Sequence, residues 1–166
     1  MGLAFLIFAG FGWGKPVEID PRYYRNPAKD NMLVALAGPV SNFILAFVLY
    51  FIIAIMQVFV KAEFELVGIA FMMLSYAAVI NLSLGLFNLI PLPPLDGSKI
   101  LKYFLKGRAL ETLYTIERYS TLILLALFVT NIPSYILTPL ILWIQTAMLW
   151  IISGIFTGVG YIIALF

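Results

Sequence analysis

The sequence predicts an all-α polytopic membrane protein with about four transmembrane helices, an N-terminal helix stump and one helix end broken by prolines. Hydrophobic residues make up 63% of the 166 residues and charged residues only 11%, whereas soluble domains average roughly 45–50% apolar and about 25% charged residues. Long uncharged stretches alternate with short charged segments, and a helix needs roughly 20 apolar residues to cross the hydrocarbon. We therefore treat residues 1–166 as a single membrane-embedded domain.

The uncharged stretches define the expected helices in chain order. Residues 1–11 are apolar but have about half the length of a crossing, which predicts only the stump of a helix. Residues 33–60 are long enough for the first complete span. Residues 66–95 form the second, but they end in the sequence Pro-Leu-Pro-Pro at 91–94, where a helix cannot continue. We expect the last turns of this span to be unwound.

The last uncharged stretch, 119–166, would exceed the hydrocarbon thickness of roughly 30 Å more than twofold if it were one helix. The chain is expected to turn at three positions that disfavour helix, namely Asn131, Pro133 and Ser134. This predicts one helix over about 109–130 and another from about Tyr135 onward. Pro139 is expected to divide the last segment into a re-entrant piece and a span.

Basic residues are concentrated in two segments, 12–32 and 97–118. The segment 61–65 between the first two spans carries one lysine and two glutamates instead. Short cytoplasmic loops carry an excess of Lys and Arg, so we expect the two basic segments in the cytoplasm and 61–65 on the opposite side. The protein is expected to be multi-pass and to lie in the cell membrane of a prokaryote.

Composition also restricts the chemistry. The chain has no cysteine and no histidine, so it offers no disulfide, thiolate or imidazole ligand. The net charge is only +2, which makes nucleic acid a poor candidate partner, and membrane lipid is the expected surrounding. Residues 15–20 alternate enough to form a short extended strand that could pair with an unwound peptide. The oligomeric state stays open.

Asp96 is the acid that adjoins an apolar span, directly after the proline-rich segment. Irregular backbone at membrane depth needs protein or water beside it, and a carboxylate there is costly unless it faces a polar cavity or a metal. Asp96 is therefore a candidate functional residue. The alternative is that Asp96 only caps the following helix, with Gly97 allowing the turn. Capping explains neither Asn88 nor the three prolines.

These residues resemble a known motif. The matching positions are Asn88, Pro91, Leu95, Asp96 and Gly97, which fit N-x-x-P-x-x-x-L-D-G of the site-2 protease family. Three upstream segments resemble, in order and spacing, the family's region after its second helix: Gly12-Trp-Gly-Lys-Pro-Val17, Asn26-Pro27 and Ala37-Gly-Pro-Val-Ser-Asn42. Together the matches extend over most of the chain.

The resemblance implies an intramembrane zinc metalloprotease, a hydrolase that cuts the helices of membrane-protein substrates. In that family the Asp of L-D-G is the third protein ligand of zinc, which would make Asp96 the metal ligand. Asn88 would be a donor on the substrate or oxyanion side. Asn42 is a candidate for the cavity near the metal because a buried amide in lipid needs a partner. Helix packing by the small residues around Asn42 is the alternative there.

The sequence departs from the family in one essential respect. The family's other two zinc ligands and its general base come from an H-E-x-x-H helix, and this chain contains no histidine. A catalytic zinc site needs about three protein ligands plus a water. The chain as given is therefore expected to be N-terminally truncated, beginning midway through the family's second helix, and to be inactive with an incomplete zinc site.

Two other classes of function remain open. The first is a non-catalytic membrane pseudoprotease or binding module that uses the same fold, and the absent histidines support it. The second is an ion-coupled transporter in which Asp96 takes up a proton or sodium beside unwound backbone. A transporter is disfavoured because no repeat is visible and only one intramembrane acid is present.

Overall fold

The computed structural model describes residues 20–59, 65–130 and 132–163. The elements are a 3-10 turn η1 (Pro21–Tyr23) and five helices: α2 (Pro27–Phe59), α3 (Glu65–Asn88), α4 (Asp96–Phe104), α5 (Arg108–Val129) and α6 (Ile132–Ile163). No strand occurs within these ranges, which confirms the all-α class. The expected helix stump at 1–11, and all but the last residue of the expected strand at 15–20, lie outside the described residues.

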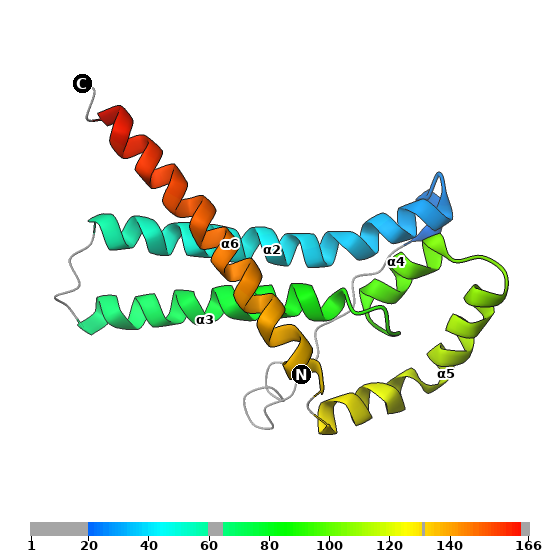
Figure 1. Cartoon of the computed structure of the whole chain (residues 1–166). Helices are drawn as coiled ribbons and strands as arrows, with labels where there is room; N and C mark the ends of the chain where they lie inside the picture. The colour runs from blue at the N-terminus through cyan, green and yellow to red at the C-terminus, as the bar shows by residue number, and fades with distance from the viewer. Residues whose placement is uncertain (1–19, 60–64, 131, 164–166) are drawn as a thin grey trace.

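Helices α2 and α3 run side by side in opposite directions and confirm the first two expected spans (Figure 1). Proline suits the first position of a helix, where its missing N–H costs nothing, and Pro27 occupies that position in α2. The preceding Asn26 caps the helix, because its side-chain oxygen accepts a hydrogen bond from the Lys29 N–H at 3.3 Å. The Asp30 carboxylate in turn accepts one from the Asn26 N–H at 2.9 Å.

Helix α6 crosses the α2–α3 pair diagonally (Figure 1). Its Ile152 joins a small buried cluster with Tyr50 and Ile53 of α2 and Ala78 of α3. Most other large apolar side chains on these helices are exposed, as expected where lipid rather than protein covers them. Helices α2, α3 and the part of α6 from Pro133 to Gly158 are long and apolar enough to cross a membrane.

Helix α5 begins and ends close to the residues that the sequence predicts, but only part of it is apolar. Its first half carries four charged residues, namely Arg108, Glu111, Glu117 and Arg118, and only the second half is uncharged. It is not among the described helices with the length and apolarity of a span, so three of about four expected crossings are shown. Figure 1 shows α5 running from the end of the α2–α3 pair near α4 toward the start of α6.

The expected break between the last two helices is confirmed, but two details are wrong. Helix α6 begins at Ile132 rather than near Tyr135, because Pro133 fits within the first helical turn. Pro139 lies inside α6 and does not divide it. A proline removes one backbone hydrogen bond, which membrane helices tolerate. The 32 residues of α6 would extend about 48 Å, so a tilted crossing accommodates its length better than a perpendicular one.

The proline-rich segment is unwound, as expected. Helix α3 ends at Asn88, residues 89–95 form turns, and α4 begins at Asp96. The segment 97–118, treated as a loop from the sequence, is largely helical, since it contains α4 and the first half of α5. Gly107 joins the two helices with a φ of 56°, a left-handed conformation that glycine adopts without steric cost.

Candidate metal and substrate site at the end of α3

The turns after α3 place Asp96. The Leu92 N–H donates to the Ile90 carbonyl at 2.8 Å, and the Leu95 N–H donates to the Leu92 carbonyl at 2.9 Å. The Ser98 hydroxyl donates to the Leu95 carbonyl at 2.7 Å, which ties the first turn of α4 to these turns. The three prolines of the segment have no N–H to satisfy. Several backbone N–H and C=O groups of this irregular segment are therefore hydrogen-bonded within the protein, as lipid surroundings require.

Gly97 is the point of closest backbone approach in this region. A Cβ atom built on Gly97 would overlap the backbone carbonyl groups of Leu89 and Ile90. The start of α4 is thus pressed against the unwound end of α3, at a separation that only glycine permits. This contact fixes where the neighbouring Asp96 can lie.

The carboxylate of Asp96 faces the protein. Its Oδ2 atom lies 3.4 Å from the position of an ideal Cβ on Gly38 of α2. Its Oδ1 atom accepts a hydrogen bond and ion pair from Lys99 Nζ at 2.8 Å, and the side chain is 29% exposed. The Asp96 carboxylate therefore packs against α2. Asp96 is not the N-cap of α4, because Leu95 occupies the capping position, so capping does not explain the carboxylate.

Asn42 and Asn88 lie on neighbouring turns of the same region. Both amides are half-buried and have no hydrogen-bonding partner among the described residues. Asn42 lies one turn beyond Gly38, in line with the buried Pro39 and Ala46 of α2. Both residues thus lie near the end of α3 that leads into the turns before Asp96.

The register of α2 against α3 brings Asn88 to this region. A Cβ on Gly85 would lie 2.9 Å from the ring of Phe43, so the two helices touch one residue from Asn42. Asn88 follows Gly85 by one turn, and the helices run antiparallel. Helix α3 therefore ends at Asn88 close to α2. The turns that follow then bring Asp96 against Gly38 of α2.

The described residues do not by themselves fit a zinc ion. They contain no group of three His, Cys, Asp or Glu side chains positioned to hold a metal. The only charged partner of Asp96 within 4 Å among these residues is the cation Lys99. A single carboxylate paired with an ammonium group does not provide the roughly three protein ligands of a catalytic zinc.

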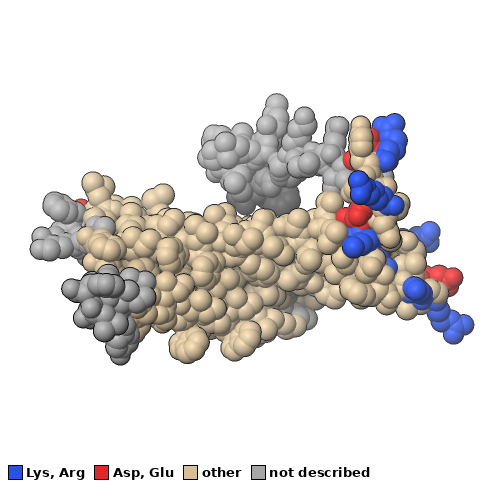
Figure 2. All heavy atoms as spheres, turned by 90° about the horizontal axis from the view of Figure 1, so that it is seen from above, with Lys and Arg blue, Asp and Glu red and all other residues tan. Residues whose placement is uncertain are grey.

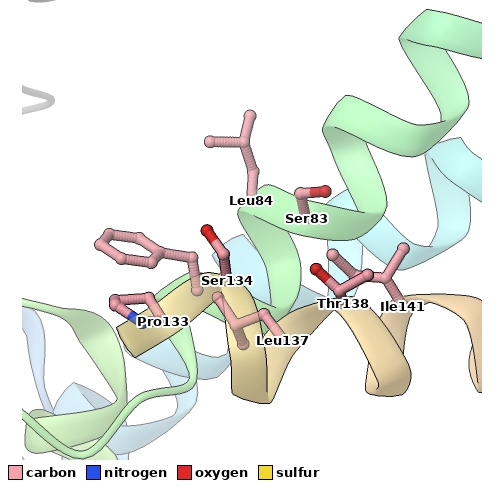
Figure 3. A pocket seen from close by; sticks show the side chains of 8 residues that line it. Ser83, Leu84, Pro133, Ser134, Leu137, Thr138 and Ile141 are labelled. Carbon is pink, nitrogen blue, oxygen red and sulfur yellow. The ribbon is translucent and has the colours of Figure 1, made fainter. Parts of the chain in front are cut away.

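An open groove of about 420 Å³ lies between the last turns of α3 and the first turns of α6 (Figure 3). Its lining is mostly apolar and is formed by Ser83, Leu84, Phe87, Pro133, Ser134, Leu137, Thr138 and Ile141. The Ser83 hydroxyl donates to the Val79 carbonyl at 2.8 Å. The groove lies at the same end of α3 as Asn88, although Asn88 is not among its lining residues.

Two residues at the site were not singled out from the sequence for the roles they have here. Lys99 was placed only among the basic residues, although the spacing of three residues to Asp96 on a helix predicts such a pair. For Gly38 the sequence left helix packing and a functional role open, and the structure places it against the carboxylate. No local pattern indicates that contact, because it depends on how α4 docks on α2.

The fold and the site together define a class: a helical membrane protein in which a proline-broken helix end places an acid against a neighbouring span. Residues 60–130 match the model of Peptidase family M50. The chain is 36% identical over 158 residues to YwhC of Bacillus subtilis (strain 168), a proposed zinc metalloprotease, and the match covers 93% of this chain and 71% of YwhC. The chain belongs to Peptidase family M50, the site-2 protease family.

A second relative extends the same assignment to an archaeon. MJ0611 of Methanocaldococcus jannaschii, also a proposed zinc metalloprotease, is 36% identical over 75 residues, which cover 45% of this chain and 35% of MJ0611. No solved structure matches the chain. Family membership supports a zinc-metalloprotease-like function and a membrane-embedded fold.

Proposed function

We propose that this chain forms the part of an intramembrane zinc metalloprotease that supplies Asp96 as a zinc ligand. The observation that carries the proposal is the position of Asp96, which a proline-broken helix end holds against Gly38 of the neighbouring span. A carboxylate at such a position is costly unless it serves a polar or metal site. Membership of a zinc metalloprotease family makes zinc the corresponding ion.

The described residues hold no group of three metal-binding side chains and the sequence contains neither histidine nor cysteine, so the other ligands are proposed to come from another segment or chain. The chain alone is therefore expected to be inactive and to bind zinc weakly. In the absence of the other ligands, the Lys99 ammonium group neutralises the Asp96 carboxylate. Lys99 would have to release the carboxylate when a metal binds.

The proposed substrate is a helix of another membrane protein. The groove between α3 and α6 supports this assignment because its lining is mostly apolar and it lies at the end of α3 that carries Asn88. The half-buried amides of Asn42 and Asn88 have no partner among the described residues, so they remain able to bind an unwound substrate backbone. Asn88 would act as a donor on the oxyanion side.

The test measures zinc content. Purified chain alone should carry well under one zinc per molecule, whereas chain joined to or co-expressed with a membrane helix that bears H-E-x-x-H should carry about one. In that complex, Asp96→Asn should reduce zinc content and abolish cleavage of a membrane-helix substrate. Asp30→Asn is the matched control, since Asp30 lies at the capped start of α2. Full zinc loading of the Asp96→Asn complex would contradict the proposal.

A non-catalytic membrane module is the second candidate, and the ion pair between Asp96 and Lys99 favours it. In such a protein the pair is permanent and only stabilises the turn at the end of α3. The same experiment separates the two candidates. A complex that folds with the added helix but still binds no zinc would support the non-catalytic module.

A further inference from the structure

Charged side chains gather at one end of the described molecule (Figure 2). Residues 20–30 and 96–118 carry eight Lys or Arg residues against five Asp or Glu residues. Ion pairs engage three of the cations, namely Arg22, Lys99 and Lys102. The other five have no carboxylate partner in the described part of the chain: Arg25, Lys29, Lys106, Arg108 and Arg118. This end therefore has an excess of uncompensated positive charge.

One of these free cations lines a polar hollow. Arg118 forms a depression of about 300 Å³ on α5 together with Tyr114, Thr115 and Tyr119. Both tyrosines are exposed, at 54% and 53%, so their hydroxyl groups are accessible. The Thr115 hydroxyl donates to the Glu111 backbone carbonyl at 3.0 Å. A guanidinium group and two phenol hydroxyls offer several N–H and O–H donors to one ligand.

The carboxylates near the hollow do not neutralise Arg118. Glu117 is bound by Lys102 of α4, with Nζ 2.7 Å from Oε2. Lys102 also lies 4.9 Å from the centre of the Tyr114 ring, where cation and ring attract each other. These two contacts hold one wall of the hollow in place. Glu111 lies two turns before Arg118, about 10 Å away along the helix axis, which is too far for an ion pair.

The hollow lies at the boundary between the charged and the apolar parts of the chain. Arg118 is the last charged residue of the sequence, and every residue from Tyr119 onward is uncharged. Tyrosine is enriched at the level of the lipid headgroups, and arginine near the end of an apolar segment extends its charge toward that level. A ligand in the hollow would therefore meet the membrane interface.

We propose that this hollow binds the phosphate of an anionic phospholipid headgroup. The Arg118 guanidinium group provides paired donors that match phosphate geometry, and the hydroxyls of Tyr114 and Tyr119 add donors at the rim. The remaining free cations at this end raise the local concentration of anionic lipid. The site is independent of zinc and of proteolysis, because it lies on α5 rather than at the end of α3.

Lipid retention tests the site. Purified chain in neutral detergent is titrated with phosphatidylglycerol or phosphatidylcholine, and bound lipid is counted by native mass spectrometry. Wild-type chain should retain the anionic lipid about tenfold better, and Arg118→Gln should remove most of that preference, the size expected when a hydrogen-bonded ionic contact is lost. Arg25→Gln removes an exposed, unpaired cation from the same end and should change retention less than twofold.

Three outcomes would overturn the proposal. Equal losses in Arg118→Gln and Arg25→Gln would indicate a diffuse field rather than a site. Equal retention of both lipids would show that the hollow does not recognise the charge of the headgroup. Displacement of phosphatidylglycerol by millimolar inorganic phosphate would show that the hollow binds free phosphate instead. Should Arg118→Gln fail to give a monodisperse helical protein, the double variant Tyr114→Phe and Tyr119→Phe replaces it. Unchanged retention in that variant would equally reject the site.

Discussion

At the scale of single residues, the candidate site depends on one close approach that needs glycine, at Gly97. Gly97 lies against the backbone of Leu89 and Ile90, and Gly38 lies against the carboxylate of Asp96. The first contact involves backbone atoms on both sides, so no side-chain rotation can relieve an added methyl group. The second involves the end of a side chain and leaves room for an ordinary van der Waals contact.

Replacing Gly97 by alanine should therefore destabilise the protein by about 1–3 kcal/mol, the usual range for overpacking a close contact. Thermal unfolding in detergent, followed by near-UV circular dichroism, measures the change. The matched control is Gly68→Ala in α3, where an added Cβ meets nothing within 4 Å. Alanine there should be neutral or stabilising by about 0.5–1 kcal/mol. Equal stabilities of the two variants would contradict the close contact at Gly97.

At the scale of elements, the contact of α2 with α3 sets the register that aligns the site. Gly85 of α3 receives the ring of Phe43 from α2, and this is the tightest contact of Gly85. The register places Asn88 near Asn42, because both lie within one turn of that contact. Small residues allow such close packing of membrane helices, where the hydrophobic effect gives little driving force.

Gly85→Ala should cost about 1–3 kcal/mol because the added methyl group meets the Phe43 ring. Phe43→Leu removes the ring and should recover part of that loss when the two changes are combined. A double-mutant cycle of unfolding free energies then gives a coupling of about 0.5–3 kcal/mol, typical of residues in contact. Additive effects of the two changes would show that Phe43 and Gly85 do not touch.

The sequence predicted the positions of the helices better than the packing between them. Uncharged stretches and prolines gave α2, the unwound end of α3 and the break before α6, since these depend on local chemistry. The short helix α4 was missed because nine residues contain too few turns for a clear periodicity. Pro139 was over-interpreted because the cost of a proline in a membrane helix depends on its surroundings.

At the scale of the whole molecule, charge is distributed unequally between the two ends (Figure 2). The described Lys and Arg residues gather at the end that carries α4 and the start of α2, while Glu65 starts α3 at the other end. By the positive-inside rule we propose that the basic end faces the cytoplasm.

Single cysteines test this orientation, and the chain has no native cysteine to interfere. Cysteine placed at Arg22 or at Lys106 should react with a membrane-impermeant maleimide only after the cytoplasmic side is opened. Cysteine at Glu65 should react in intact cells, because it lies at the opposite end. Labelling of positions 22 and 65 from the same side would refute the topology.

The sequence by itself determined the class of the protein, its main spans and the residue Asp96. Hydropathy, prolines and a motif are local properties, and lipid leaves the chain few ways to satisfy its backbone. Only the tertiary structure decided that the Asp96 carboxylate lies against Gly38 of α2, that Gly85 receives the ring of Phe43 and that Lys102 of α4 pairs with Glu117 of α5. These features depend on the docking of one helix on another and on side-chain directions, which a sequence pattern does not specify.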